Sequence, residues 1–212
     1  MTTSLVRLVT LGRAVWPVPG DADRPPNLPG FTASPFGPLV AEVADRCLSA
    51  VFGQPPAPPR RAGGTALVMV SRWGDMATEA AVTGAVDAGR KASPLLFYQS
   101  VPSAVLGVVA ARWGLAGPVI CISPAGDPAA EGRELAELLI EDGSADDVLV
   151  VWVELAIRGD RPDRAEAVLM SVDGGPLGLD SGRARAGEGG AYDIDDGNGA
   201  YDGDDGDDGE GP

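Results

Sequence analysis

Apolar segments of two kinds alternate along the first 172 residues of the chain. Runs rich in β-branched residues predict five strands, at residues 5–18, 65–70, 119–122, 148–156 and 165–172. Stretches with apolar residues at helical spacing predict four helices, at residues 39–52, 76–88, 101–113 and 128–140. The uninterrupted runs TALVMV and VICI are typical of strands buried on both faces. Strands separated by helices predict a layered α/β fold around a buried mixed sheet.

Segments rich in Pro and Gly interrupt this alternation. The loop 19–38 contains Phe31 and Phe36, which indicates that it packs on the rest of the protein. The segment 54–64 (QPPAPPRRAGG) is expected to form a proline-rich surface linker. After residue 173 Gly and Asp dominate, and such a segment cannot bury enough apolar surface to fold alone. We therefore expect a folded domain at residues 1–175 and a disordered acidic tail at residues 176–212.

The formal charge of −15 is concentrated at the carboxyl end of the chain. Residues 187–212 hold ten of the 31 carboxylates and no basic residue, so the remainder has 21 acids, 16 bases and a net charge of −5. Nucleic-acid binding needs a basic stripe, which the sequence lacks. The basic residues are 15 Arg and one Lys, which with abundant Ala and Gly is typical of a GC-rich bacterial genome.

Membrane insertion and export are not expected from the sequence. No apolar run reaches the roughly 18 residues that a transmembrane helix requires. The first apolar stretch contains Arg7 and Arg13, unlike a signal peptide. These features predict a cytoplasmic protein without a membrane span.

The residue inventory excludes several kinds of chemistry. The chain has no His, so it cannot form a Ser-His-Asp triad, a Cys-His pair or a His-ligated metal site by itself. Its two cysteines, Cys47 and Cys121, are expected to be buried, reduced thiols. A calcium loop with Gly197 at its sixth position would place Tyr192 and Ile194 at ligand positions, which excludes that assignment. We expect neither a metal nor a cofactor.

The window 93–130, SPLLFYQSVPSAVLGVVAARWGLAGPVICISPAGDPAA, carries the most informative pattern. It resembles the β-ketoacyl synthase family, the condensing enzymes of fatty-acid and polyketide synthesis, around their active-site cysteine. In that comparison Gly126 stands where the family has its nucleophile, and Arg72-Trp73 replaces a glycine pair of the family. The residues that fall at matching spacing are Pro94, Gly107, Gly114, Leu115, Gly117 and Pro118.

The resemblance covers roughly residues 1–160, the first half of a condensing enzyme. It implies a thiolase-like half-domain, the N-terminal half of a condensing-enzyme fold. The second half, which normally brings two histidines, has no counterpart here. A short synthase-like chain of this kind is similar to the truncated partner subunit of aryl-polyene clusters, which stands beside a complete synthase in the manner of a chain-length factor. The implied partners are a complete β-ketoacyl synthase and, indirectly, an acyl-carrier protein.

The resemblance also implies which residues have roles. Condensation needs a thiolate for the acyl chain and imidazoles to polarise a thioester, and Gly126 and the His-free chain offer neither. No catalytic residue is therefore expected, and the chain would instead complete an interface and shape the partner's acyl tunnel. The residues implied at the tunnel or interface are Leu96, Phe97, Ser103, Leu106, Gly107, Ile120 and Ile122.

Other interpretations stay open. Gly126 is alternatively a plain turn residue that needs a positive φ. Leu96 and Phe97 are alternatively ordinary core or interface residues. The chain is alternatively a free-standing hydrolase that uses Ser123 and Asp127, although no His would support them, or a purely stabilising scaffold whose pocket has closed.

Overall fold

The computed structural model describes residues 7–91, 93–156 and 162–173. The chain divides into two compact units, residues 1–177 and 178–212. The second unit, and with it the expected acidic tail, lies outside the described residues. All the helices and strands named below belong to the first unit.

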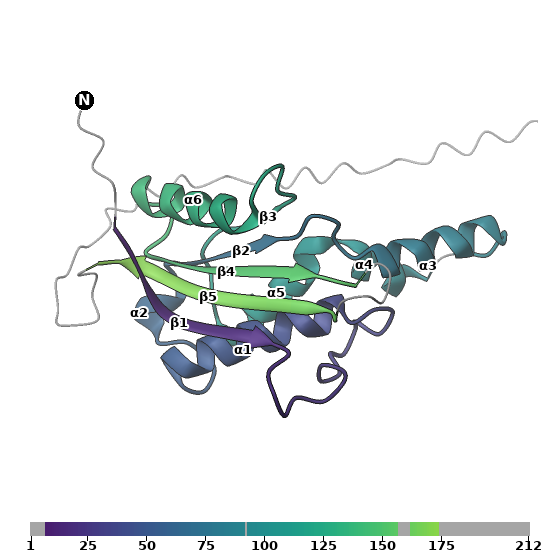
Figure 1. Ribbon diagram of the computed structural model, residues 1–212, viewed down its shortest axis with the longest axis horizontal. Coiled ribbons are helices and arrows are strands. Elements are labelled where there is room, and N and C mark those ends of the chain that lie inside the picture. The colour runs from purple at the N-terminus through teal and green to yellow at the C-terminus, as the bar shows by residue number, and fades with distance from the viewer. Residues whose placement is uncertain (1–6, 92, 157–161, 174–212) are drawn as a thin grey trace, which may run out of the picture. The chain divides into compact units, whose positions relative to one another are not determined.

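A five-stranded mixed sheet forms the centre of the domain (Figure 1). Its strands lie in the order β1-β5-β4-β2-β3. Strands β2, β3 and β4 are parallel, and β5 runs antiparallel to its neighbours β1 and β4. The predicted mixed sheet is confirmed, and its strands are Leu8–Trp16 (β1), Thr65–Val70 (β2), Val119–Ile122 (β3), Asp147–Glu154 (β4) and Arg164–Val172 (β5).

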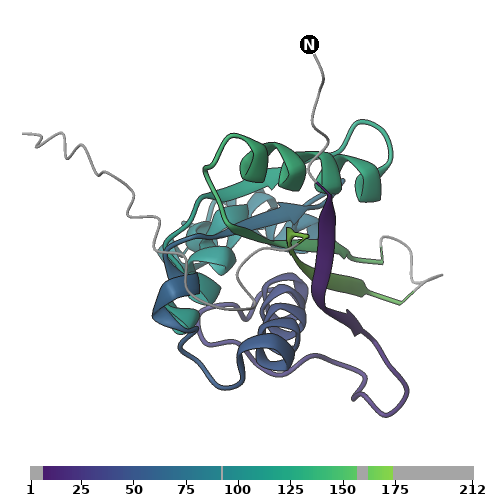
Figure 2. The same ribbon diagram turned by 90° about the vertical axis from the view of Figure 1, so that its left-hand side faces the viewer.

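Helices cover both faces of this sheet, so the domain has three layers (Figures 1 and 2). Helices α1 and α5 cover one face and α6 covers the other. The four predicted helices correspond to α1, α3, α5 and α6, whereas α2 and α4 were not predicted. The bounds are Phe36–Phe52 (α1), Pro59–Ala62 (α2), Met76–Asp87 (α3), Pro94–Ser100 (α4), Pro102–Trp113 (α5) and Pro128–Glu141 (α6).

Two apolar cores, one on each side of the sheet, hold the layers together. Side chains alternate between the two faces of a strand, so Leu67 and Met69 of β2 pack with α1 and α5, and Val68 and Val70 pack with α6. All six residues of β2 are buried, as its uninterrupted apolar run predicted. On α1, the positions at steps of four face the sheet and are buried, namely Leu39, Val43 and Cys47.

The proline-rich segment 54–64 is only in part the surface linker that was expected, because some of its residues are exposed and others are buried. Ala57 is buried, and the short helix α2 buries the guanidinium of Arg61. Arg61 Nη1 lies 2.5 Å from both carboxylate oxygens of Asp147, which is itself fully buried at the start of β4. The segment is drawn inward because a buried carboxylate needs a charged, hydrogen-bonding partner.

Strand β3 also differs from expectation, because it is not buried. It lies at the edge of the sheet and pairs only with β2, which leaves one side of it uncovered. Val119 and Cys121 are exposed, and Ile120 and Ile122 are half-buried. The expected buried thiol at Cys121 is therefore wrong, whereas Cys47 is buried as expected.

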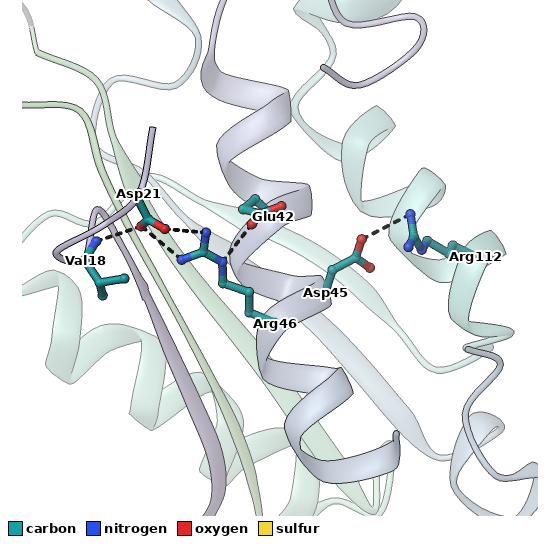
Figure 3. A network of polar contacts seen from close by, with 6 residues as sticks. All are labelled: Val18, Asp21, Glu42, Asp45, Arg46 and Arg112. Atoms are coloured by element: carbon teal, nitrogen blue, oxygen red, sulfur yellow. Dashed lines mark hydrogen bonds and ion pairs between the residues drawn. The ribbon is translucent and has the colours of Figure 1, made fainter. Parts of the chain in front are cut away.

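The loop that follows β1 packs on the protein, as its aromatic residues predicted. Phe31 and Phe36 are buried. The guanidinium of Arg46 on α1 donates to both carboxylate oxygens of Asp21 in the loop, at 2.8 and 3.0 Å, and to Glu42 at 2.7 Å (Figure 3). It also lies 4.8 Å from the ring centroid of Trp16.

These contacts fix the start of the loop. The hydrogen bonds from Arg46, followed by one from the Val18 backbone N–H, hold the pKa of Asp21 below its ordinary value. On the other side of α1, Asp45 pairs with Arg112 at 3.2 Å (Figure 3). Asp45 also accepts a hydrogen bond of 2.6 Å from the indole of the buried Trp113. Helix α1 therefore joins the loop to α5.

In the described part of the chain, no single helix is both long and apolar enough to cross a bilayer. Among the helices that the structure describes, only α4 and α5 taken together reach the required length and composition, and they meet at an angle of 87°.

Candidate functional site

The turn at residues 123–127 connects β3 to α6 at the carboxyl end of the parallel strands. Arg72 follows β2 and Glu154 ends β4, so the ends of all three parallel strands meet at this turn. Open α/β sheets place their ligand sites at this edge. Gly126, the residue that stands at the nucleophile position of the family resemblance, lies here and is exposed.

The backbone of Gly126 does not need glycine. Gly126 is not among the described glycines with a positive φ, so the interpretation of it as a turn glycine that requires that conformation is wrong. A Cβ at this position would instead lie 3.1 Å from Oε1 of Glu131. A side chain is therefore sterically possible here only if the Glu131 carboxylate gives way.

Glu131 closes the turn. Its carboxylate accepts a hydrogen bond from the backbone N–H of Gly126 and another, 3.2 Å long, from that of Ala125. Glu131 lies in the first turn of α6, where the helix dipole favours an acidic side chain. Two adjacent backbone N–H groups are the kind of donors that stabilise a developing oxyanion in acyl transfer. Here a carboxylate of the protein occupies them.

Arg72 also braces this turn. Its Nη2 donates 2.7 Å to the carbonyl of Gly126, and its own carbonyl accepts 3.0 Å from the hydroxyl of Ser123. Its backbone N–H donates 2.6 Å to Glu154. Arg72, which replaces a glycine in the family resemblance, thus supplies a long side chain that cross-links the turn.

Ser123 and Asp127, the residues of the hydrolase alternative, both have structural partners. The Ser123 hydroxyl donates to a backbone carbonyl rather than to a base. Asp127 caps α6 and accepts 2.9 Å from the N–H of Ala130. Activation of a serine requires a base within hydrogen-bond reach of its hydroxyl. This geometry gives no support to the hydrolase alternative.

An open cleft of about 790 Å³ lies beside the turn, at the carboxyl ends of β1 and β4. Trp73, Trp152 and Glu154 are among the residues that line it. The Trp152 indole donates 2.7 Å to the carbonyl of Pro128, and Glu154 accepts from Arg72. These polar groups are engaged with the backbone, so they brace the turn rather than offer acid–base chemistry.

Helix α4, which was not predicted, presents apolar side chains to solvent. Gln99 is buried, and its Oε1 accepts from the N–H groups of Thr32 and Ala33 at 2.8 and 2.9 Å. This anchor fixes α4 on the loop with Phe97 outward, 68% exposed. The sequence does carry a signal for this helix, because Ser93 caps it and Pro94 occupies its first turn.

The residues implied at a tunnel or interface lie on three adjacent elements, α4, α5 and β3. Phe97, Ser103 and Gly107 are exposed, and Leu96 is half-buried. The half-buried Ile120 and Ile122 belong to the open edge strand. Leu106 differs from the others, because it is fully buried in the core against α1.

Exposed apolar side chains concentrate on one part of the molecule. Of ten large apolar side chains that are exposed in the described residues, seven lie between residues 73 and 101. They lie on α3, on α4 and in the segments next to these helices, which contact each other. Exposed apolar side chains mark an interaction site where they form a patch. We call this region the apolar surface; its members are Trp73, Met76, Val86, Leu95, Phe97, Tyr98 and Val101.

Comparison with known proteins identifies the fold. No protein-family model matches the sequence, and no curated protein matches it. Solved structures do match. One is a ketosynthase in complex with its chain length factor from Xenorhabdus doucetiae, with 24% identity and a TM-score of 0.53, covering 70% of this chain and 63% of that one.

Two further structures agree. The ishigamide ketosynthase/chain length factor matches with 16% identity and a TM-score of 0.58, covering 73% of this chain and 48% of that one. A β-ketoacyl synthase from Burkholderia phymatum matches with 14% identity and a TM-score of 0.59, covering 79% and 59%. The match thus spans about half to five-eighths of the length of these chains. The domain has the ketosynthase-like, thiolase-type fold that the sequence predicted.

Proposed function

We propose that this chain is a non-catalytic subunit that pairs with a complete β-ketoacyl synthase and helps to shape the acyl tunnel of that partner, in type II polyketide, polyene or fatty-acid-like synthesis. One observation carries the proposal. On a ketosynthase-like fold, the turn between β3 and α6 is closed by the carboxylate of Glu131, and its exposed Gly126 is the residue that the family resemblance aligns with the nucleophile.

The chemistry of condensation supports a partner that does the catalysis. The reaction needs a thiolate to hold the acyl chain and imidazoles to polarise the thioester. This chain has no His, and its exposed thiol, Cys121, lies on the edge strand β3 rather than in the turn. The partner would supply the nucleophile and the bases, and an acyl-carrier protein would deliver substrate to the partner.

The open edge of the sheet supports pairing. An exposed edge strand presents unpaired backbone groups, and β3 also exposes Val119 and Cys121 beside them. Strand pairing or close packing by another protein would cover this edge. Two of the structures with the same fold are described as a ketosynthase with a chain length factor, which makes a ketosynthase the natural partner.

The exposed positions on α4 and α5 support a role in chain length. Phe97 on α4 and Ser103 in the first turn of α5 both face outward. In the family resemblance, these positions border the acyl tunnel across the interface. Their side chains would form part of the wall that a growing acyl chain meets.

The test is the product profile of the reconstituted pair with Ser103→Trp. Overpacking costs roughly 1–3 kcal/mol, which corresponds to about a tenfold to hundredfold shift toward shorter products. Ser144→Trp, at an exposed turn after α6, is the matched control and should leave the profile unchanged. If Ser103→Trp leaves the product profile unchanged in an intact complex, the proposal of chain-length control is refuted. The proposed function is then only stabilisation of the partner.

A further inference from the structure

Helix α3 has the largest share of exposed residues among the described helices, and most of its exposed residues are apolar or small. It projects from the body and packs mainly against α4 (Figure 1). Nine of its twelve residues are exposed, and six of those nine are Met, Ala, Gly or Val. Only Thr78 and Ala85 are buried.

Such a helix is unusual on a free surface. A surface helix normally pairs an apolar stripe with a polar outer face, and a helix that is apolar around most of its circumference is normally buried. The outer surface of α3 carries Met76 (48% exposed) and Val86 (61% exposed), with Glu79 and Asp87 as its only charges. The composition therefore indicates that another surface covers α3 in the functional state.

The helix is nevertheless firmly formed within the chain. Asp75 caps it and accepts from the N–H of Thr78 at 3.0 Å and from the Thr78 hydroxyl at 2.7 Å. Twelve residues span about 18 Å, so α3 is a preformed arm of that length beside the exposed Trp73. A preformed element binds with a smaller entropic cost than one that must fold on binding.

Three occupants are possible, and the sequence and fold favour one. The chain's own end, residues 187–212, has ten carboxylates, no basic residue and only three large apolar side chains, so it is unsuited to cover an uncharged helix. A second copy of the chain would bring together two proteins of net charge −15. Two solved structures of the same fold contain a ketosynthase with a chain length factor.

We propose that α3 is a docking arm that inserts into an apolar, uncharged groove of the ketosynthase subunit, with Met76 and Val86 as its anchors. This inference rests on the proposed function and adds to it. The contact surface then extends beyond α4 and β3 along the whole apolar surface. Apolar anchors in such a groove are the residues whose replacement costs most in binding.

The experiment measures binding of the purified full chain to the complete β-ketoacyl synthase encoded nearest to its gene. Met76→Asp and Val86→Asp should each weaken binding at least tenfold. Leu138→Asp, at an equally exposed apolar position on α6, is the matched control and should bind as the unchanged chain does. Circular dichroism melts of all three variants verify that the fold is retained.

A second measurement identifies the occupant directly. Thr83, exposed on α3, is replaced by the photo-crosslinker p-benzoylphenylalanine. The predicted product is a cross-link to the ketosynthase. Three other results would overturn the proposal that α3 docks on the ketosynthase: a cross-link to a second copy, a cross-link to residues 187–212 of the same chain, or no cross-link in a complex that still forms. Each of them leaves the proposed function standing. If the unchanged chain does not bind the ketosynthase, the proposed function itself fails, and the arm fails with it.

Discussion

The carboxylate of Glu131 lies in tight contact with the place where a Cβ on Gly126 would be. It accepts the backbone N–H of Gly126, and Oε1 would stand 3.1 Å from a Cβ at that position. The turn is therefore closed by a carboxylate, and in the family resemblance its Gly126 stands where the nucleophile would be. We expect that a cysteine at this position would not by itself create a working site.

Gly126→Cys tests this closure. The nearby carboxylate disfavours the thiolate and should raise the pKa of the introduced thiol, and no imidazole accompanies it. We expect no condensation activity, and alkylation by iodoacetamide at pH 7.5 at least tenfold slower than in Gly126→Cys combined with Glu131→Gln. The rates are followed by mass spectrometry of the peptide that contains position 126. Equal rates in the two variants would show that Glu131 does not control the turn.

The two native thiols should differ in reactivity. Burial raises the pKa of Cys47 to about 11 and also raises that of Cys121, but Cys121 is exposed on β3. At pH 8 a thiol with that pKa is about one thousandth thiolate, so a disulfide reagent should titrate Cys121 alone in the folded chain. Binding of the ketosynthase should slow this reaction by covering β3. Rapid labelling of Cys47 in the native protein would contradict the core that the structure shows.

Cys47 also makes a pH-dependent contribution to stability. Its pKa is higher in the folded chain than the ordinary thiol value of 9.0, so the unfolded chain loses this proton first as the pH rises. The contribution is full below about pH 9 and is lost as the pH approaches about 11. The free energy of unfolding in urea is measured at pH 8 and pH 10.5 for the unchanged chain and for Cys47→Ala. The difference in pH dependence between the two proteins is the contribution of Cys47, and an identical pH dependence would contradict this prediction.

The buried ion pair between Arg61 and Asp147 should matter far more than an exposed one. Arg61→Met leaves the Asp147 carboxylate buried without its partner, which costs about 3–5 kcal/mol of the free energy of unfolding. Arg13→Met removes the exposed pair with Glu166 and should cost about 0–1 kcal/mol. Urea denaturation measures both. Equal losses would mean that α2 does not anchor the proline-rich segment.

The sequence predicted the sheet well because its central strands are buried on both faces. Runs such as TALVMV in β2 leave little ambiguity, since every side chain is apolar or small. The same reasoning failed for β3, whose VICI run is equally apolar but lies at an open edge. An apolar run predicts that a strand is buried, but it does not indicate whether the same chain or a partner buries it. The wrong prediction of a buried β3 is thus consistent with the proposed partner.

The short helix α2 and the side chains that hold the turn at Gly126 could not be predicted from the sequence, for a different reason. Helix α2 has four residues, too few for any helical periodicity, and its buried Arg61 pairs with a residue 86 positions away. The turn at Gly126 was located correctly in the sequence, but one of the side chains that brace it, Arg72, is 54 residues distant. Contacts between residues so far apart leave no mark in a single sequence.

The central claim, pairing with a complete β-ketoacyl synthase, is tested most directly by native mass spectrometry after co-expression of the two full chains. The apolar surface and the open edge of β3 predict a 1:1 complex that survives purification. A stable, soluble monomer that unfolds cooperatively and does not bind the synthase would contradict the proposal.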